Sequence, residues 1–287
     1  MTAELIEAAP ADWARGGGDR RRRTLVTLAV IVAVLAIVVE YGTLAADAAT
    51  TTHLDERNEP PSFAHPFGTD WLGRDMLART ARGLRLSLLI GAVAATVSAV
   101  IALVVATIAT LGRVGDTLTS WLTDLFLALP HLVLVILLAF VMGGGLRALI
   151  VAVAVTHWPS LARVLRGESR AVMSSDYVAI ARRLGRSRVD IARQHLAGHL
   201  LPQFCVGLIL LFPHAILHEA ALSFLGLGVD PSTPAIGIIL ADSMRSLSVG
   251  MWWLAVLPGV ALVLVVKLVD TLGNQLRSLL DPRSHHG

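Results

Sequence analysis

The stretch "LSLLIGAVAATVSAVIALVVATIATL" (residues 86–111) contains no charged side chain. About 20 consecutive apolar residues in a helix cross the hydrocarbon core of a bilayer, so this stretch predicts a membrane-spanning helix. Comparable apolar runs recur at 118–142, 146–163, 200–225 and 252–272. The chain is 55% hydrophobic and 16% charged, whereas a soluble domain carries about a quarter charged residues. These patterns predict an all-α integral membrane protein.

A further apolar segment at residues 24–46 follows the basic sequence "RGGGDRRRR". A basic start and an apolar core also fit a signal peptide, but the segment is long and no small-residue cleavage site follows at the usual distance. We therefore predict a retained first transmembrane helix, preceded by a tail at 1–23. Together with the five later runs it makes six transmembrane helices, and residues 47–85 then form an outer loop.

Arginine is unevenly distributed along the chain. A group of arginines falls between the fourth and fifth spans: Arg163, Arg166, Arg170, Arg182, Arg183, Arg186, Arg188 and Arg193. The terminal segments 1–23 and 276–287 are also basic, whereas the loop at 226–250 contains two aspartates and one arginine. Six spans put the basic segments on one side, which the positive-inside rule assigns to the cytoplasm. We expect a helical core at 86–275, with both termini cytoplasmic, in a multi-pass protein of the cytoplasmic membrane.

The cytoplasmic segment "SSDYVAIARRLGRSRVDIARQHL" (174–196) has the pattern of a short helix. Ser175 or Asp176 can cap its start, and Gly185 suits a left-handed stop. Three residues share one face at i, i+4, i+7 spacing: Tyr177, Ala181 and Leu184. Taken alone, such an amphipathic helix would lie on lipid headgroups.

The spacing "YVAIARRLG" resembles the EAA loop of ABC-importer permeases, whose short coupling helix docks into an ATPase subunit. Three other blocks resemble the dipeptide, oligopeptide and nickel permeases of that family: "HPFGTDWLGRDMLARTARGLRLSL" (65–88), "EAALSFLGLGVDPSTPAIGIIL" (219–240) and "LLDPR" (279–283). The chain departs from the family pattern at two places. Ala179 stands where the loop usually has glutamate, and Pro202 comes four residues later than the family's proline.

The resemblance implies a set of partners. It predicts a second, homologous permease subunit in a heterodimer, two ATP-binding-cassette ATPase subunits and an extracytoplasmic substrate-binding protein, all around a bilayer and without nucleic acid. The residues implied in coupling to the ATPase are Asp176, Tyr177, Ala179, Ala181, Arg182, Leu184 and Gly185. The chain has no G-x-x-x-x-G-K-[ST] phosphate loop, and Lys267 is its only lysine. We therefore expect no enzyme activity and no bound cofactor in this chain, with ATP and magnesium held by the partner subunits.

The outer stretch "FGTDWLGRD" (67–75) allows two interpretations. Asp70, Trp71, Arg74 and Asp75 can form a docking or gating element that faces the substrate-binding protein. Alternatively, the stretch is a capped interfacial helix, anchored by Trp71, that orients the second span.

The stretch "LFPHAILHE" (211–219) places three ionisable groups at membrane depth, where such groups are costly and often functional. His214 and His218 are four residues apart and share one helix face, a spacing that suits a metal ion. An intramembrane metalloprotease would need H-E-x-x-H, whereas this order is H-x-x-x-H-E. Glu219 also belongs to the block that resembles the whole permease family.

The histidines therefore support two interpretations. In the first, His214, His218 and Glu219 line the outer half of the translocation path, where the two histidines transiently contact a metal ion or a metal chelate. In the second, the histidines hydrogen-bond to neighbouring helices around the bend at Pro213. His131 is expected at the cytoplasmic end of its span, where it faces water or bonds to the backbone.

Together these features predict the permease subunit of an ATP-driven ABC importer that forms half of a translocation pathway. The histidines favour nickel or another transition metal, carried as a metallophore or chelate complex. The alternative cargo is a di- or oligopeptide. A channel or structural membrane subunit without ATP coupling is the alternative from another class, and the EAA-like loop argues against it.

Overall fold

The computed structural model describes residues 13–191 and 196–280. Within these ranges the chain is built from helices, together with one isolated β-bridge between Thr69 and Asp75. The helices are α1 (Trp13–Leu44), α2 (Met76–Thr110), α3 (Arg113–Ala128), α4 (His131–Val141), α5 (Gly145–Met173), α6 (Asp176–Arg183), α7 (Arg188–Ile191), α8 (Ala197–Phe224), α9 (Ile236–Leu247) and α10 (Trp253–Leu280).

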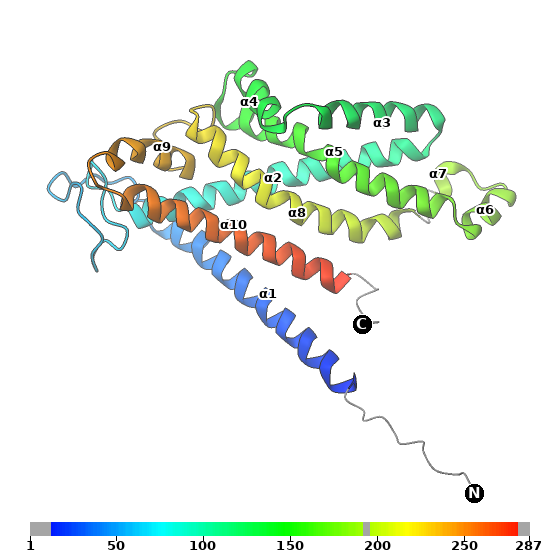
Figure 1. The fold of residues 1–287 in the computed structure, drawn as a ribbon, viewed down its shortest axis with the longest axis horizontal. Helices are drawn as coiled ribbons and strands as arrows, with labels where there is room; N and C mark the ends of the chain where they lie inside the picture. Colours follow the sequence, from blue (N-terminus) through cyan, green and yellow to red (C-terminus); the bar gives the residue numbers. More distant parts are fainter. Residues whose placement is uncertain (1–12, 192–195, 281–287) are drawn as a thin grey trace, which may run out of the picture.

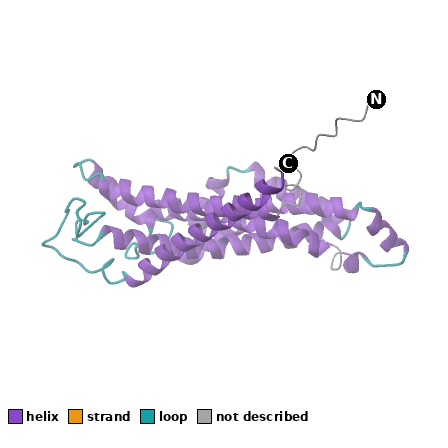
Figure 2. Ribbon diagram, turned by 90° about the horizontal axis from the view of Figure 1, so that it is seen from below, coloured by secondary structure: helices purple, strands orange, loops and turns teal. Residues whose placement is uncertain are grey.

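The long helices lie roughly along one axis, and the connections gather at the two ends of the bundle (Figures 1 and 2). The α6 end holds the start of α1, the helices α6 and α7, and the end of α10 (Figure 1). The opposite end, here the loop end, holds the loop at residues 45–75 and helix α9 (Figure 1). Both ends of the described chain therefore lie on the same side, as the six-span prediction requires.

Among residues 13–191 and 196–280, five helices are long and apolar enough to cross a membrane: α1, α2, α5, α8 and α10. The sixth predicted span, at 118–142, is not one straight helix. It is broken into α3 and α4, which meet at an angle of 94°. Pro130 lies at the break and lacks an N–H group, and Leu129 before it is extended, as a residue before proline prefers.

Three ion pairs hold α3 along α5. Asp116 accepts hydrogen bonds from Arg166 and Arg170 at 2.7 Å each, and Arg163 lies 2.8 Å from Asp124. The first half of the broken span is thus tied to α5 toward the α6 end, while α4 departs from the direction of α3 and packs against α5 (Figure 1).

Helix α2 is the centre of the bundle, because it packs against α1, α5 and α8. It begins at Met76, so the loop before it ends ten residues earlier than the predicted boundary at 85. From residue 91 onward, the buried residues of its apolar stretch are all small: Gly91, Ala94, Ala95, Ser98, Ala99, Ala102, Ala106 and Ala109. Small side chains let helix backbones approach closely, which is the main source of packing between helices in lipid.

Helix α1 lies at the edge of the bundle and contacts α2 and α10. Only 11% of its most apolar window is buried, so most of its apolar surface faces outward. Its close contact with α2 depends on Gly42, where an added Cβ would lie 2.6 Å from the carbonyl oxygen of Ala81. A helix with outward apolar side chains and a tight crossing point is typical of a peripheral span in a multi-span membrane protein.

Candidate functional site

A cavity of about 480 Å³ lies between α5 and α8. The end of α3, the start of α4 and Arg277 of α10 complete its border. Much of its wall is apolar, with Phe126, Leu161 and Leu210 among the lining residues. It adjoins the break between α3 and α4, so the bend at Pro130 opens the bundle at this point.

Four histidines line this cavity, including the two that the sequence singles out. His214 and His218 lie one turn apart in the half of α8 nearer the loop end. His131 at the start of α4 and His157 of α5 join them. The expectation that His131 sits at the cytoplasmic end of its span is wrong, because the bend at Pro130 carries His131 into the bundle.

Three of these rings contact one another. The Nε2 atoms of His131 and His157 are 3.2 Å apart. The ring centroids of His218 lie 4.9 Å from His131 and 4.7 Å from His157, and each pair of rings is nearly perpendicular. Among the described residues, His131, His157 and His218 form a group whose possible ligand atoms all lie within 4.8 Å of one another. The histidines that could share a metal ion therefore come from three helices, and His214 of the predicted pair lies one turn away from the group.

The histidine side chains bond to their own helices. The Nδ1 atom of His157 lies 2.8 Å from the carbonyl oxygen of Val153, and that of His218 lies 2.8 Å from the carbonyl oxygen of His214. His214 makes the same contact with Leu210 at 3.2 Å. A carbonyl can only accept, so Nδ1 carries the proton in each bonded ring and Nε2 keeps its lone pair. The second interpretation expected His214 and His218 to bond to neighbouring helices around Pro213. It is wrong about the partners, because the Nδ1 atoms of both residues bond to carbonyl oxygens of α8 itself.

Glu219 lies apart from the cavity. Its side chain is fully buried and accepts hydrogen bonds from Ser87 of α2 and, at 2.9 Å, from Ser223 of α8. It thus ties α8 to α2, on a different side of α8 from the histidines. The expected grouping of Glu219 with His214 and His218 is not seen, because successive residues on a helix point in different directions.

Helix α6 stands at the end of the bundle that the sequence assigns to coupling. Val178 is fully buried and Ala181 is half-buried. Both belong to a hydrophobic cluster that also contains residues of α5. Ile180 and Leu184 are 57% and 79% exposed. Tyr177 is also exposed, and its ring stacks at 6.5 Å on that of His199 in α8. Hence Tyr177, Ala181 and Leu184 do not form one buried face.

The end of α6 has the predicted left-handed stop. Gly185 has φ +83°, and the N–H of Arg186 closes the turn on the carbonyl oxygen of Ala181 at 3.1 Å. Ala179 is exposed on α6, as is Asp176 at its start, while the side chain of Arg182 lies outside the described residues. Residues 192–195 of the EAA-like loop lie outside the described part of the chain as well.

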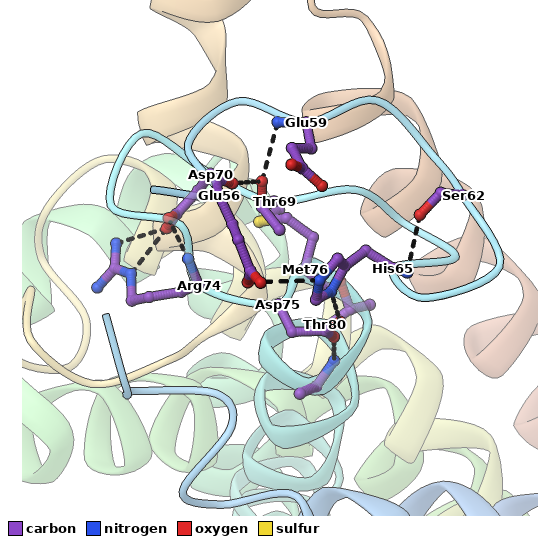
Figure 3. A network of polar contacts seen from close by, with 11 residues as sticks. Glu56, Glu59, Ser62, His65, Thr69, Asp70, Arg74, Asp75, Met76 and Thr80 are labelled. Atoms are coloured by element: carbon purple, nitrogen blue, oxygen red, sulfur yellow. Dashed lines mark hydrogen bonds and ion pairs between the residues drawn. The ribbon is translucent and has the colours of Figure 1, made fainter. Parts of the chain in front are cut away.

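The outer stretch at 67–75 is held by a network of internal polar contacts (Figure 3). Asp70 is 4% exposed and pairs with the guanidinium groups of Arg74, at 2.7 Å, and Arg79. Burial raises the pKa of Asp70, but the hydrogen bonds and charges of the two arginines outweigh it and hold the pKa below its usual value. Asp70 and Arg74 thus form ion pairs within this chain, rather than presenting their charges to a partner.

Asp75 caps α2, because its carboxylate accepts a hydrogen bond from the N–H of Ala78 at 2.7 Å. The same carboxylate lies 2.8 Å from Nδ1 of His65 (Figure 3). Gly73 has φ +72°, and an added Cβ would lie 1.7 Å from the carbonyl oxygen of His53. Of the four residues expected to dock or gate, only Trp71 is prominently exposed, at 59%. This geometry agrees with the second interpretation in one respect, because the stretch ends in the cap of α2. The predicted interfacial helix is wrong, because residues 67–75 form a loop held by internal polar contacts.

Comparisons with known proteins place these features in a family. The family described as "Binding-protein-dependent transport system inner membrane component" matches residues 98–286. The dipeptide transport system permease protein of Bacillus subtilis is 34% identical, over 80% of this chain and 72% of its own length. The di/tripeptide transport system permease protein of Pseudomonas aeruginosa is 36% identical, over 76% of this chain and 72% of its own length. The oligopeptide transport system permease protein of B. subtilis is 32% identical, over 82% of this chain and 77% of its own length.

These relatives are named as transport components rather than enzymes. Their family is consistent with a multi-span helical bundle and with the resemblance of residues 174–196 to an EAA loop. The matched region contains α3 to α10, hence the cavity, the histidines and α6. The chain belongs to the family of inner membrane components of binding-protein-dependent transport systems, as a permease of the dipeptide, oligopeptide and nickel ABC-importer group.

Proposed function

We propose that this chain forms half of the translocation pathway of an ATP-driven importer for di- or oligopeptides. The names of its relatives support a peptide cargo, and none of the three compared above names nickel. The peptide alternative therefore replaces nickel as the main proposal. The observation that carries the proposal is the cavity of about 480 Å³ beside the broken span, which offers an apolar wall with a few polar groups.

The proposed orientation puts the α6 end in the cytoplasm. The arginines of α3, α5 and α6 gather toward that end, as the positive-inside rule requires of a cytoplasmic face. The loop end, with Trp71, would then face the extracytoplasmic substrate-binding protein. Both termini would be cytoplasmic in this arrangement.

The proposed assembly contains a second permease subunit and two ATPase subunits that bind ATP and magnesium. Ile180 and Leu184 are exposed apolar side chains on a short helix, so they suit a contact with an ATPase surface. Val178 of α6 lies in the same buried cluster as Leu165 and Val172 of α5. Movement of α6 by an ATPase would therefore be transmitted to α5, which forms one wall of the cavity.

Uptake by the reconstituted complex tests this proposal. We expect ATP-dependent uptake of a labelled dipeptide or oligopeptide into proteoliposomes, and no uptake when ATP is omitted. Leu184→Asp should lower uptake at least about tenfold and weaken co-purification with the ATPase, because it places a charge on the proposed contact. Val249→Asp, which places the same charge on an exposed apolar side chain at the loop end, should leave co-purification with the ATPase unchanged.

Two results would refute the proposal. If the purified chain conducts the peptide without ATP, the channel interpretation replaces it. If the reconstituted complex takes up Ni²⁺ or a nickel chelate but none of the peptides, the peptide cargo is wrong and the metal interpretation returns.

A further inference from the structure

We propose that His131, His157 and His218 together bind one divalent transition-metal ion in the wall of the cavity. The three residues come from α4, α5 and α8, and 26 and 61 residues separate them along the chain. Their rings nevertheless meet pairwise, with centroids 4.3, 4.9 and 4.7 Å apart. Three imidazoles that converge from three helices form the kind of ligand set that holds zinc, nickel or copper.

Two of the rings are already oriented as ligands. His157 and His218 each donate their Nδ1 proton to a backbone carbonyl oxygen at 2.8 Å. This bond fixes the tautomer and leaves the Nε2 lone pair available for a metal ion. Metal-binding histidines in proteins almost always have such a partner on the second nitrogen. The structure therefore holds both the first ligand atoms and the groups that orient them.

The distances suit a small metal ion after a modest adjustment. A tetrahedral ion with metal–nitrogen bonds of about 2.0–2.1 Å needs its ligand nitrogens about 3.3 Å apart. The Nε2 atoms of His131 and His157 are 3.2 Å apart, and the ligand atoms of all three rings lie within 4.8 Å. A small adjustment of the helices that carry the three rings closes the remaining gap.

Binding would change the proton arrangement at His131. Since Nε2 of His157 is an acceptor, the contact at 3.2 Å requires Nε2 of His131 to donate its proton. A metal ion in the site takes the lone pair of His157, and His131 must then present its own Nε2 lone pair. Its proton moves to Nδ1 by exchange with water, so three neutral imidazoles surround the ion and no net proton is released.

The surroundings of the three rings favour a transition metal that prefers nitrogen ligands, with one coordination position left for a ligand other than the protein. Within the described part of the chain, the cavity wall contributes no carboxylate to the three-histidine group. Magnesium and calcium, which prefer several oxygen ligands, are therefore poorly suited. Three protein ligands leave a fourth position that faces the cavity, where water or a carboxylate can bind. The site does not depend on the identity of the transported cargo, so its test is separate from that of the proposed function.

Direct metal binding tests the site. The purified complex should carry an affinity tag without histidines, and His285 and His286 should be replaced by alanine to remove the C-terminal histidine pair. Titration with Co²⁺, followed by visible absorption, and calorimetry with Zn²⁺ and Ni²⁺ report the geometry and the stoichiometry. We expect one saturable site per chain and visible bands typical of nitrogen ligands around four-coordinate Co²⁺.

Variants identify the ligands. His157→Ala and His131→Gln should each weaken metal binding at least about tenfold, as loss of one ligand or its orienting partner does. His218→Asn keeps a side-chain N–H near the carbonyl of His214 but removes the Nε2 ligand, so it should weaken binding without loss of assembly. His214→Ala is the matched control, because it lies in the same cavity one turn away, and it should change the affinity by less than about threefold.

The opposite pattern would overturn the proposal. If the wild-type complex binds no more metal than the variant that lacks all three histidines, there is no such site. The proposal also fails if His214→Ala weakens binding as much as His157→Ala, because the ligands would then be a different set. Size-exclusion profiles and thermal unfolding of each variant show that lost binding is not lost folding, and His218→Asn decides the matter if the alanine variant does not assemble.

Discussion

Two regions of the bundle contain buried ionisable groups, and they differ in how those groups are used. At the loop end, Asp70 accepts hydrogen bonds from the backbone of Leu72 and Arg74 at 2.9 Å each and pairs with two guanidinium groups. In the cavity, His157 and His218 each use one ring nitrogen on their own helix, and their rings lie against each other and against the ring of His131. The carboxylate of Asp70 is fully engaged within the chain, whereas the histidine rings of the cavity retain capacity to bind.

Glu219 belongs with the first region although it is adjacent to His218 in sequence. Its two serine partners and complete burial make it a link between α2 and α8. A costly polar group at membrane depth is therefore not evidence of a substrate site by itself. What distinguishes the two regions is whether the ligand atoms are already paired.

Removing the carboxylate of Asp70 should have the largest effect on stability. Asp70→Ala leaves Arg79, whose side chain is 5% exposed, as a buried cation without its partner. The loss of one partner of a buried ion pair costs about 3–5 kcal/mol, so the midpoint of thermal unfolding should fall sharply and little assembled complex should form. Trp71→Ala, at the exposed neighbour, is the control and should leave the midpoint nearly unchanged. A mild effect of Asp70→Ala would show that the network is open to water.

Glu219→Ala should have the second-largest effect. It creates a cavity between α2 and α8 and deprives Ser87 and Ser223 of their acceptor, for an expected cost of about 2–3 kcal/mol. His214→Ala, five residues earlier on the same helix, removes a more exposed ring that faces the cavity and should cost less than about 0.5 kcal/mol. Thermal unfolding of the two variants measures the difference. Equal losses would remove the distinction between the two regions.

Gly185→Val should act on coupling with a smaller effect on stability. An added Cβ meets nothing within 4 Å, so the penalty comes only from φ +83° and amounts to about 1–2 kcal/mol for a residue with a side chain. We expect uptake to fall while ATP hydrolysis by the complex continues. Gly185→Asn is the matched control, because asparagine tolerates this conformation, and it should retain most uptake. Unchanged uptake in Gly185→Val would show that the turn does not transmit movement.

Much of the fold could be predicted from the sequence. Five long apolar runs became helices because lipid forces every backbone group to bond within its own segment. The position of α6 and its end at Gly185 could also be predicted, because helix capping and a left-handed glycine depend only on neighbouring residues. The break at 118–142 was only hinted at by Pro130, since proline disrupts a helix but does not fix the angle of 94° that follows.

The site was predicted less completely, because it depends on contacts between distant segments. The i, i+4 spacing identified His214 and His218 but could not show that His131 and His157 meet them from other helices. The available signal was weak: both are ionisable groups within or beside apolar runs, as His218 is. Local reasoning also grouped Glu219 with the histidines, although its neighbour in space is Ser87, 132 residues away. Sequence spacing gives the face of a helix but not what packs against that face.

The smallest predicted effect concerns pH at the loop end. The hydrogen bond to Asp75 raises the pKa of His65 above 6.5, against the opposing effect of partial burial and with the help of nearby carboxylates. Because the folded pKa is raised, protonated His65 stabilises the loop; this contribution is complete below pH 6.5 and is lost as the pH rises through the folded pKa.

Amide hydrogen exchange of residues 65–76 should therefore become faster as the pH is raised from about 6 to about 8, after correction for the intrinsic pH dependence of exchange. His65→Gln should remove this pH dependence, whereas His53→Gln, in the same loop, should keep it. The cap that Asp75 provides to α2 persists in every case, because it needs only the carboxylate and the N–H of Ala78. If His65→Gln retains the full dependence, another group at the loop end titrates, and the pairing of His65 with Asp75 is not what couples this region to pH.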